Sequence, residues 1–142
     1  YDGDTEANAF PQGARDLKAL FCSHHGFLMA TPEHNGSTSA VLKNAIDWVS
    51  RQAPNEPNLV AYQGKTAVLM AASPGQLGGL RGLVHVRSIL GNIGVLVLPN
   101  QVAIPQAHLA FNDDGSLKDA KHQANVENLG RKLVEVTGKL RP

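Results

Sequence analysis

Two short stretches carry the residue types that could bind a ligand. The first loop, residues 31–37, follows an apolar run and leads into a helical pattern. The second loop, residues 73–79, follows another apolar run and is rich in glycine. Because glycine has no Cβ, main-chain amides in such loops can approach a flat ligand closely. They can donate to ring nitrogens and carbonyls, and they can stabilise negative charge that appears when a ring is reduced.

Other chemistries lack the patterns that they need. The sequence has no Gly-x-Ser-x-Gly turn for a hydrolase nucleophile and no Gly-x-x-x-x-Gly-Lys-Ser/Thr loop for nucleotide hydrolysis. Cys22 stands near His24 and His25, but no second ligand pair accompanies them, so we predict no metal site. A glycine-rich turn after a strand can also be a simple connection. Taken together with the first loop, the second is better explained as part of a binding site.

Apolar runs and helical patterns alternate along the chain, and this alternation predicts an α/β fold. The runs 27–30, 66–72 and 95–98 are continuous, as expected for parallel strands covered on both faces. Strands that alternate with helices form βαβ units and a parallel sheet. Right-handed crossovers bring the strand ends, and both loops, to the edge where open α/β sheets bind ligands. Helices are expected from Pro11 to about His24 and over 39–51, 80–90 and 117–137, with loops over 1–10, 53–64 and 99–116.

Length and composition favour one globular domain. Of 142 residues, 42% are hydrophobic and 18% are charged, which excludes a largely disordered chain. A net charge of +1 and 5% aromatic residues offer nucleic acid neither a basic patch nor stacking platforms. No apolar stretch approaches the roughly 18 residues of a transmembrane helix. Cys22 is the sole cysteine, so no internal disulfide can form, and we expect a reducing, cytoplasmic location.

Five segments of the sequence resemble one known family. Residues 30–37 read ATPEHNGS and 41–48 read VLKNAIDW, and this block is highly specific. Residues 72–81, ASPGQLGGLR, continue the match, while 95–105 and 111–115 match more loosely. On these residues the chain resembles the NADPH-dependent FMN reductases, a flavodoxin-like family that includes quinone, azo and chromate reductases. The resemblance implies a three-layer α/β/α fold, in which residues 1–142 form a single, partial domain.

The resemblance also implies FMN as cofactor and NADPH or NADH as co-substrate. Electrons would pass from NAD(P)H through FMN to a quinone-like or other small acceptor, and no catalytic side chain is expected because the cofactor carries the chemistry. The family forms homodimers or homotetramers, which implies an oligomer here. The residues that match those along the family's flavin ring are Pro32, Glu33, His34, Asn35, Gly36, Ser73, Pro74, Gly75, Gly78 and Gly79.

The sequence departs from the family in two respects. His34 stands where the family usually has tyrosine, which replaces a large aromatic wall by a smaller, titratable side chain. Family members also begin with a strand, a Ser/Arg-rich phosphate-binding loop, a helix and a second strand, a unit of about 30 residues or more that the sequence lacks. We therefore expect a fragment of a longer parent, with an open edge on its first strand and without the loop that binds the FMN phosphate.

Two functions stay open at this point. The first is an FMN-dependent NAD(P)H oxidoreductase, in which the two loops orient the ring. The second is a non-catalytic flavodoxin-like fragment that keeps these loops but acts as a structural or interaction unit without stable FMN binding. Binding of FMN and consumption of NADPH would distinguish the two functions.

Overall fold

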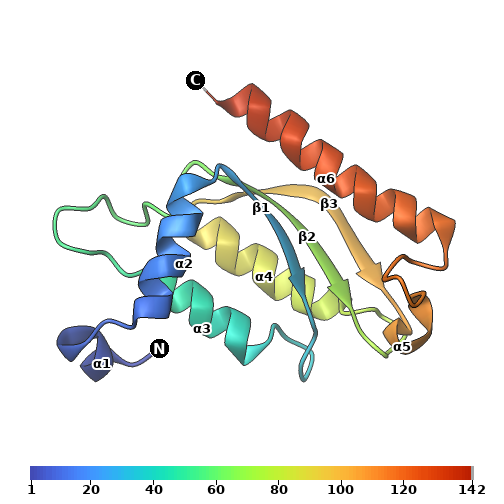
Figure 1. The fold of residues 1–142 in the computed structure, drawn as a ribbon, viewed down its shortest axis with the longest axis horizontal. Coiled ribbons are helices and arrows are strands. Elements are labelled where there is room, and N and C mark those ends of the chain that lie inside the picture. Colours follow the sequence, from blue (N-terminus) through green and yellow to red (C-terminus); the bar gives the residue numbers. More distant parts are fainter. Residues whose placement is uncertain (142) are drawn as a thin grey trace.

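The computed structural model describes residues 1–141, which form a parallel three-stranded sheet between layers of helices (Figure 1). The three strands lie in the sheet in the order in which they follow along the chain, and both neighbouring pairs are parallel, as the alternation of the sequence predicts. No helix within residues 1–141 combines the length and hydropathy that a bilayer crossing requires. The elements are α1 (Gly3–Asn8), α2 (Gln12–Ser23), β1 (Gly26–Thr31), α3 (Ala40–Val49), β2 (Thr66–Ala72), α4 (Leu80–Asn92), β3 (Leu96–Ile104), α5 (Ala107–Ala110) and α6 (Ala120–Leu140).

Two hydrophobic clusters lie on opposite faces of the sheet and confirm the three layers. On one face, strand residues such as Phe27 and Leu69 pack with side chains of α2, α3 and α4, among them Leu83. On the other face, Val68 and residues of β3 pack with Leu129 and other side chains of α6. Figure 1 shows α6 on one side of the strands and α3 and α4 on the other.

β1 is covered on one face only, which corrects the prediction that every strand is buried on both. Phe27 and Met29 point into the cluster with α2 and α3 and are buried, whereas Leu28 is 54% exposed. The reason is the path of α6, which meets β1 close to Gly26, where an added Cβ would lie 3.1 Å from Leu133 Cδ1. Within residues 1–141, β1 pairs with β2 alone, so its other edge is open, as expected.

β3 continues through Pro99, where the sequence predicted that it would stop. Proline lacks the N–H that a central strand needs, but it is tolerated on edge strands and at bulges. β3 lies at the edge of this sheet, and its register with β2 shifts between Ala67 and Leu69, which leaves an irregularity around Pro99. The Arg87 guanidinium of α4 donates to the Leu98 carbonyl across 2.8 Å, next to this irregularity.

Residues 1–10 contain a short helix where the sequence predicted a loop. Asp2 caps α1, because its carboxylate accepts from the Asp4 amide across 2.8 Å. The rings of Tyr1 and Phe10 meet the Trp48 ring edge-on, with centroids 5.0 and 5.2 Å away. A cap and two aromatic contacts thus stabilise a helix that is too short to form alone.

The other bounds differ from the prediction by a few residues. Ser39 caps α3 through a hydrogen bond from the Leu42 amide, and α4 begins at Leu80, directly after Gly79, where the sequence predicts a helix start. The last helix starts at Ala120 instead of 117, because Asp119 accepts from the His122 amide and fixes its beginning there. The segment 99–116, predicted as irregular, holds the second half of β3 and α5.

Candidate functional site

The first loop is a tight turn at the carboxyl end of β1. The His34 amide donates to the Ser37 carbonyl and the Ser37 amide donates to the His34 carbonyl, each across 3.0 Å. Between them, Asn35 and Gly36 have φ values of 50° and 75°. These are the left-handed conformations of the two-residue turn that an Asn-Gly pair favours. The sequence therefore fixes the shape of this loop locally.

Two side chains of the first loop attach it to α4. The Glu33 carboxylate accepts from Nε of Arg81 across 2.8 Å and from the Arg81 main-chain amide across 3.0 Å. The hydrogen bond from the Arg81 guanidinium holds the pKa of Glu33 below its ordinary value, so the carboxylate is charged at neutral pH. One turn further along α4, His85 Nδ1 lies 2.7 Å from Ser37 Oγ. Side-chain contacts thus fix the position of the first loop relative to α4.

The second loop is held mainly by its backbone. The Ser73 amide donates to the Ile104 carbonyl across 3.1 Å, and the Ser73 carbonyl accepts from the Ala107 amide across 3.0 Å. The Gly75 carbonyl accepts from the amide of Gln106, whose φ of 47° is rare for a residue with a side chain. These bonds join the second loop to the segment that follows β3, and they hold a strained residue in place.

Packing inside the chain requires two glycines of the second loop. Gly78 and Gly79 have φ values of 60° and 91° and are buried. An added Cβ on Gly78 would lie 2.6 Å from the Ile104 carbonyl carbon, and one on Gly79 would lie 2.6 Å from Ala71 Cβ. Both glycines therefore let the loop fold closely against the ends of β2 and β3. Contact of either glycine with a flavin stays a prediction.

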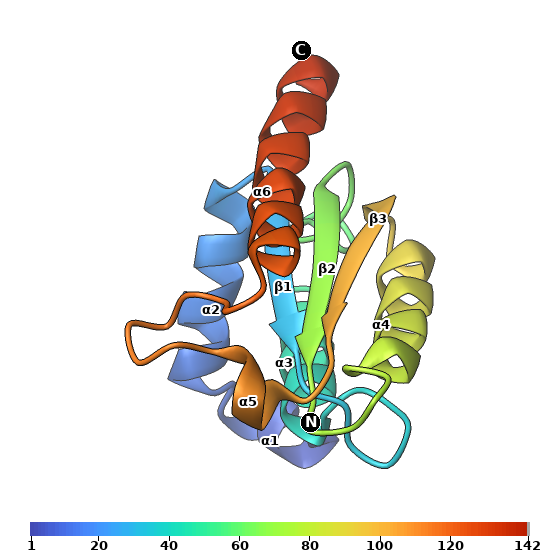
Figure 2. The same ribbon diagram turned by 90° about the vertical axis from the view of Figure 1, so that its right-hand side faces the viewer.

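The two loops lie side by side at one edge of the sheet, beyond the carboxyl ends of β1 and β2 (Figure 2). The structure thus brings the ten predicted binding residues to one region. Within residues 1–141, the amides of Asn35, Gly36 and Gln76 donate to no protein acceptor. Pro32, His34 and Pro74 are exposed at this edge. The two loops therefore offer free main-chain donors and exposed side chains to a planar ligand with polar edges.

Sequence reasoning missed the residues that hold the loops. Arg81 and His85 attach the first loop, and Gln106 attaches the second. The sequence contains one indication that the start of α4 binds a group from elsewhere, as Glu33 does at Arg81. α4 begins after Gly79, which has no side-chain acceptor, so its first amides need a partner from elsewhere in the chain. No comparable signal marks Gln106, because its role follows from the path of the chain beyond β3.

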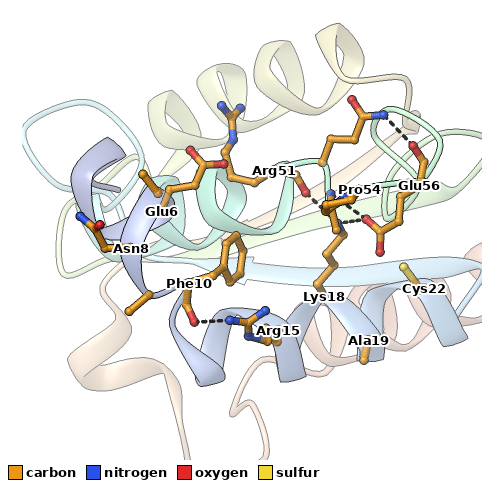
Figure 3. A pocket seen from close by; sticks show the side chains of 14 residues that line it. Glu6, Asn8, Phe10, Arg15, Lys18, Ala19, Cys22, Arg51, Pro54 and Glu56 are labelled. Atoms are coloured by element: carbon orange, nitrogen blue, oxygen red, sulfur yellow. Dashed lines mark hydrogen bonds and ion pairs between the residues drawn. The ribbon is translucent and has the colours of Figure 1, made fainter.

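A separate cavity of about 680 Å³ lies between α1, α2 and residues 51–56 (Figure 3). It is near the end of α3 away from the first loop, and it contains none of the ten predicted residues. Its charged groups are bound to neighbouring protein groups. The Lys18 ammonium pairs with Glu56 and donates to the Arg51 carbonyl, and Arg15 donates to the Phe10 carbonyl. This cavity therefore offers no convergent set of free polar groups.

Comparison with known proteins assigns the family. Residues 1–109 match the model of a family described as NADPH-dependent FMN reductase. The chain belongs to this family. An NAD(P)H-dependent FMN reductase of Pseudomonas aeruginosa is 38% identical over 128 residues, which cover 89% of this chain and 66% of that protein. A quinone reductase of Escherichia coli (strain K12) is 35% identical over 99 residues, which cover 69% of this chain and 50% of that protein. The chain thus spans about half to two thirds of the length of these relatives.

Solved structures show the same fold as this member of the FMN reductase family. The flavoenzyme NAD(P)H:(acceptor) oxidoreductase FerB from Paracoccus denitrificans matches with a TM-score of 0.82 and 28% identity, covering 98% of this chain and 74% of that one. A mutant flavodoxin from Pseudomonas aeruginosa matches with a TM-score of 0.54 and 17% identity, covering 90% of this chain and 73% of that one. The flavodoxin-like fold expected from the sequence is therefore confirmed.

Proposed function

We propose that the chain supplies the flavin-ring site of an FMN-dependent NAD(P)H oxidoreductase. The observation that carries this proposal is the pair of neighbouring loops at the carboxyl ends of β1 and β2, which present free main-chain amides. Membership of the FMN reductase family supports FMN as the ligand. When bound, FMN supplies the hydride and electron chemistry, with NADPH or NADH as donor.

The residues of the two loops have distinct proposed roles. Asn35, Gly36 and Gln76 donate main-chain hydrogen bonds to the polar edge of the ring, where they also favour negative charge. Pro32, Pro74 and Gly75 shape the surface against which the ring lies. His34 lies at the exposed edge and borders the space for co-substrate and acceptor. No residue within 1–141 is assigned to the FMN phosphate.

A quinone-like compound is the acceptor that we propose, because the relatives include a quinone reductase and a 2-hydroxy-1,4-benzoquinone reductase. Azo compounds and chromate are the other acceptors to test, since the wider family includes reductases for both. Residues 1–142 are proposed to act as one domain in the cytoplasm, where the free, exposed Cys22 would stay reduced.

We also propose a homodimer or homotetramer that buries the surface beside the first loop. Val41 on α3 is 80% exposed and Val84 on α4 is 58% exposed, and Leu77 and Leu80 are exposed nearby in the chain. All four residues lie near the N-terminal ends of α3 and α4, and exposed apolar side chains are candidates for a surface that other molecules cover. Sedimentation of the purified chain gives its oligomeric state.

The function is tested by adding FMN and NADPH to the purified chain. We expect quenching of FMN fluorescence as the ring enters the site, and NADPH consumption that depends on FMN and on a quinone. Arg15→Gln is a matched control. Arg15 lines the separate cavity, outside both loops, so its substitution should change neither FMN binding nor NADPH consumption. A chain that neither binds FMN nor consumes NADPH would contradict the enzyme function and favour the non-catalytic fragment, whose exposed Leu28 face would then be its contact surface.

His34 should determine acceptor use more than flavin binding. His34→Tyr restores the residue usual in the family and enlarges an exposed wall of the site. We expect the dissociation constant for FMN to change by less than about threefold, an energy below 1 kcal/mol. The ratio of turnover rates for a small and a bulky quinone should change. An unchanged ratio would show that the His34 side chain lies outside the acceptor space.

A further inference from the structure

We propose that Glu33 is a positioning residue, which fastens the first loop to the first turn of α4 and so sets the distance between the two loops. The link to the flavin rests on the proposed function, whereas the attachment itself rests only on contacts within the chain. Glu33 therefore acts on the cofactor site through Arg81 and the backbone of α4, without touching the ring.

Both carboxylate oxygens of Glu33 are occupied by α4. Oε2 accepts from the main-chain amides of Arg81 and Gly82 across 3.0 and 3.3 Å. Oε1 accepts from Nε of Arg81 across 2.8 Å. The Glu33 side chain is only 7% exposed, although Arg81 is 63% exposed. A carboxylate that is covered and bound in this way has no oxygen directed at a ligand.

α4 needs this partner because its own cap is missing. Gly79 holds the N-cap position and offers no side-chain oxygen. The amides of Arg81 and Gly82 are the second and third of the helix, which an N-cap side chain normally satisfies. Glu33 supplies that acceptor from another loop, and its negative charge lies at the positive end of the helix dipole.

The same contacts fix the spacing of the two loops. The second loop ends at Gly79, and the residues that bind Glu33 follow it directly. α4 also packs closely on the first loop, since a Cβ on Gly82 would lie 3.1 Å from the Ser37 carbonyl oxygen. The hydrogen bond between Ser37 and His85 adds a second attachment one turn along α4. Two attachments on one rigid helix leave the first loop little freedom to move relative to the second.

The proposal is tested by hydrogen exchange and by flavin binding in the full chain. Glu33→Ala removes the cap and the ion pair, and Arg81→Met removes the ion pair but keeps the acceptor for the amides. Loss of an N-cap acceptor corresponds to exchange that is about two- to thirtyfold faster. We expect Glu33→Ala to show this at the hydrogen-bonded amides of His34 and Ser37 and at residues 81–82, and Arg81→Met to show a smaller increase at His34 and Ser37. Both should weaken FMN binding and shift the absorption band of bound flavin.

Arg131→Met is the matched control. Arg131 forms an exposed ion pair with Glu127 on α6, away from both loops, so its loss should leave exchange at 34–37 and FMN binding unchanged. If exchange accelerates only at 81–82, Glu33 is simply a helix cap and the proposal is wrong. If the Glu33→Ala chain does not fold, Arg81→Met alone tests the proposal. Faster exchange in the first loop of that variant supports the proposal, and unchanged exchange there contradicts it. Failure of the unsubstituted chain to bind FMN would contradict the proposed function, but the exchange data would still test the attachment.

Discussion

The two loops of the site occupy the same edge of the sheet but are held in different ways. The first loop has a locally determined turn and is fixed in space by side chains, through Glu33 with Arg81 and Ser37 with His85. The second loop is fixed by main-chain bonds to the segment after β3 and by glycines that permit close packing. The first loop should therefore respond to changes of charge and of side-chain hydrogen bonding. The second should respond to added volume.

The largest expected effect comes from Gly78→Ala in the second loop. Its Cβ would stand 2.6 Å from the Ile104 carbonyl carbon, in a left-handed conformation that disfavours alanine. We expect a loss of about 2–4 kcal/mol in the free energy of unfolding. Gly75→Ala is the matched control, because its Cβ would meet nothing closer than Ser73 Oγ at 3.8 Å. Urea denaturation of both variants gives the comparison, and equal losses would contradict the role assigned to Gly78.

A smaller effect is expected from Ser37→Ala in the first loop. The substitution removes the hydrogen bond to His85, which is worth about 1 kcal/mol. We expect faster hydrogen exchange at the bonded amides of residues 34 and 37, with no change in the second loop. Ser23→Ala removes a similar contact between Ser23 and His24 at the end of α2. That variant should leave both loops unchanged. Faster exchange in the second loop of Ser37→Ala would show that the loops do not respond separately.

The smallest effect that we expect is faster hydrogen exchange in the first loop at acid pH. The pKa of Glu33 is lowered from its ordinary value of 4.5, mainly by the hydrogen bond from Arg81. A lowered pKa means that the charged carboxylate stabilises the fold above pH 4.5, and that this contribution is lost as the pH falls through the value in the folded chain. Hydrogen exchange of the bonded His34 and Ser37 amides, corrected for its intrinsic pH dependence, should become faster below pH 4.5 and should show no such change in Glu33→Gln. A rise of equal size in the substituted chain would assign the effect to another group.

The sequence predicts the local elements of the fold, whereas it does not predict the contacts between residues far apart in the chain. Thr66–Ala72 was predicted to the residue, because a continuous apolar run between turn residues has one simple explanation. Pro99 was misinterpreted, because the edge position of β3 and the Arg87 contact that tolerate it depend on tertiary structure. Exposure of Leu28 was missed for a similar reason, since burial depends on which helix covers the face.

The candidate site shows the same difference between local features, which the sequence predicts, and long-range contacts, which it does not. The Asn35-Gly36 turn and the closeness of the two loops follow from turn chemistry and from βαβ topology. The direction of the Glu33 carboxylate does not, because it depends on a helix end that lies far along the chain. The family resemblance placed Glu33 among the residues along the flavin ring, and the contacts of its two oxygens give it a different proposed role.

Binding of a flavin ring by the two loops can be measured with riboflavin, which carries the ring without the phosphate. Proton–nitrogen correlation spectra of the labelled chain should be recorded during a riboflavin titration. We predict saturable shifts of the amide signals of Asn35, Gly36 and Gln76, with the signals of Phe10 and Lys18 at the separate cavity unchanged. Shifts confined to that cavity, or no saturable shift at either loop, would contradict binding of the flavin ring by the two loops.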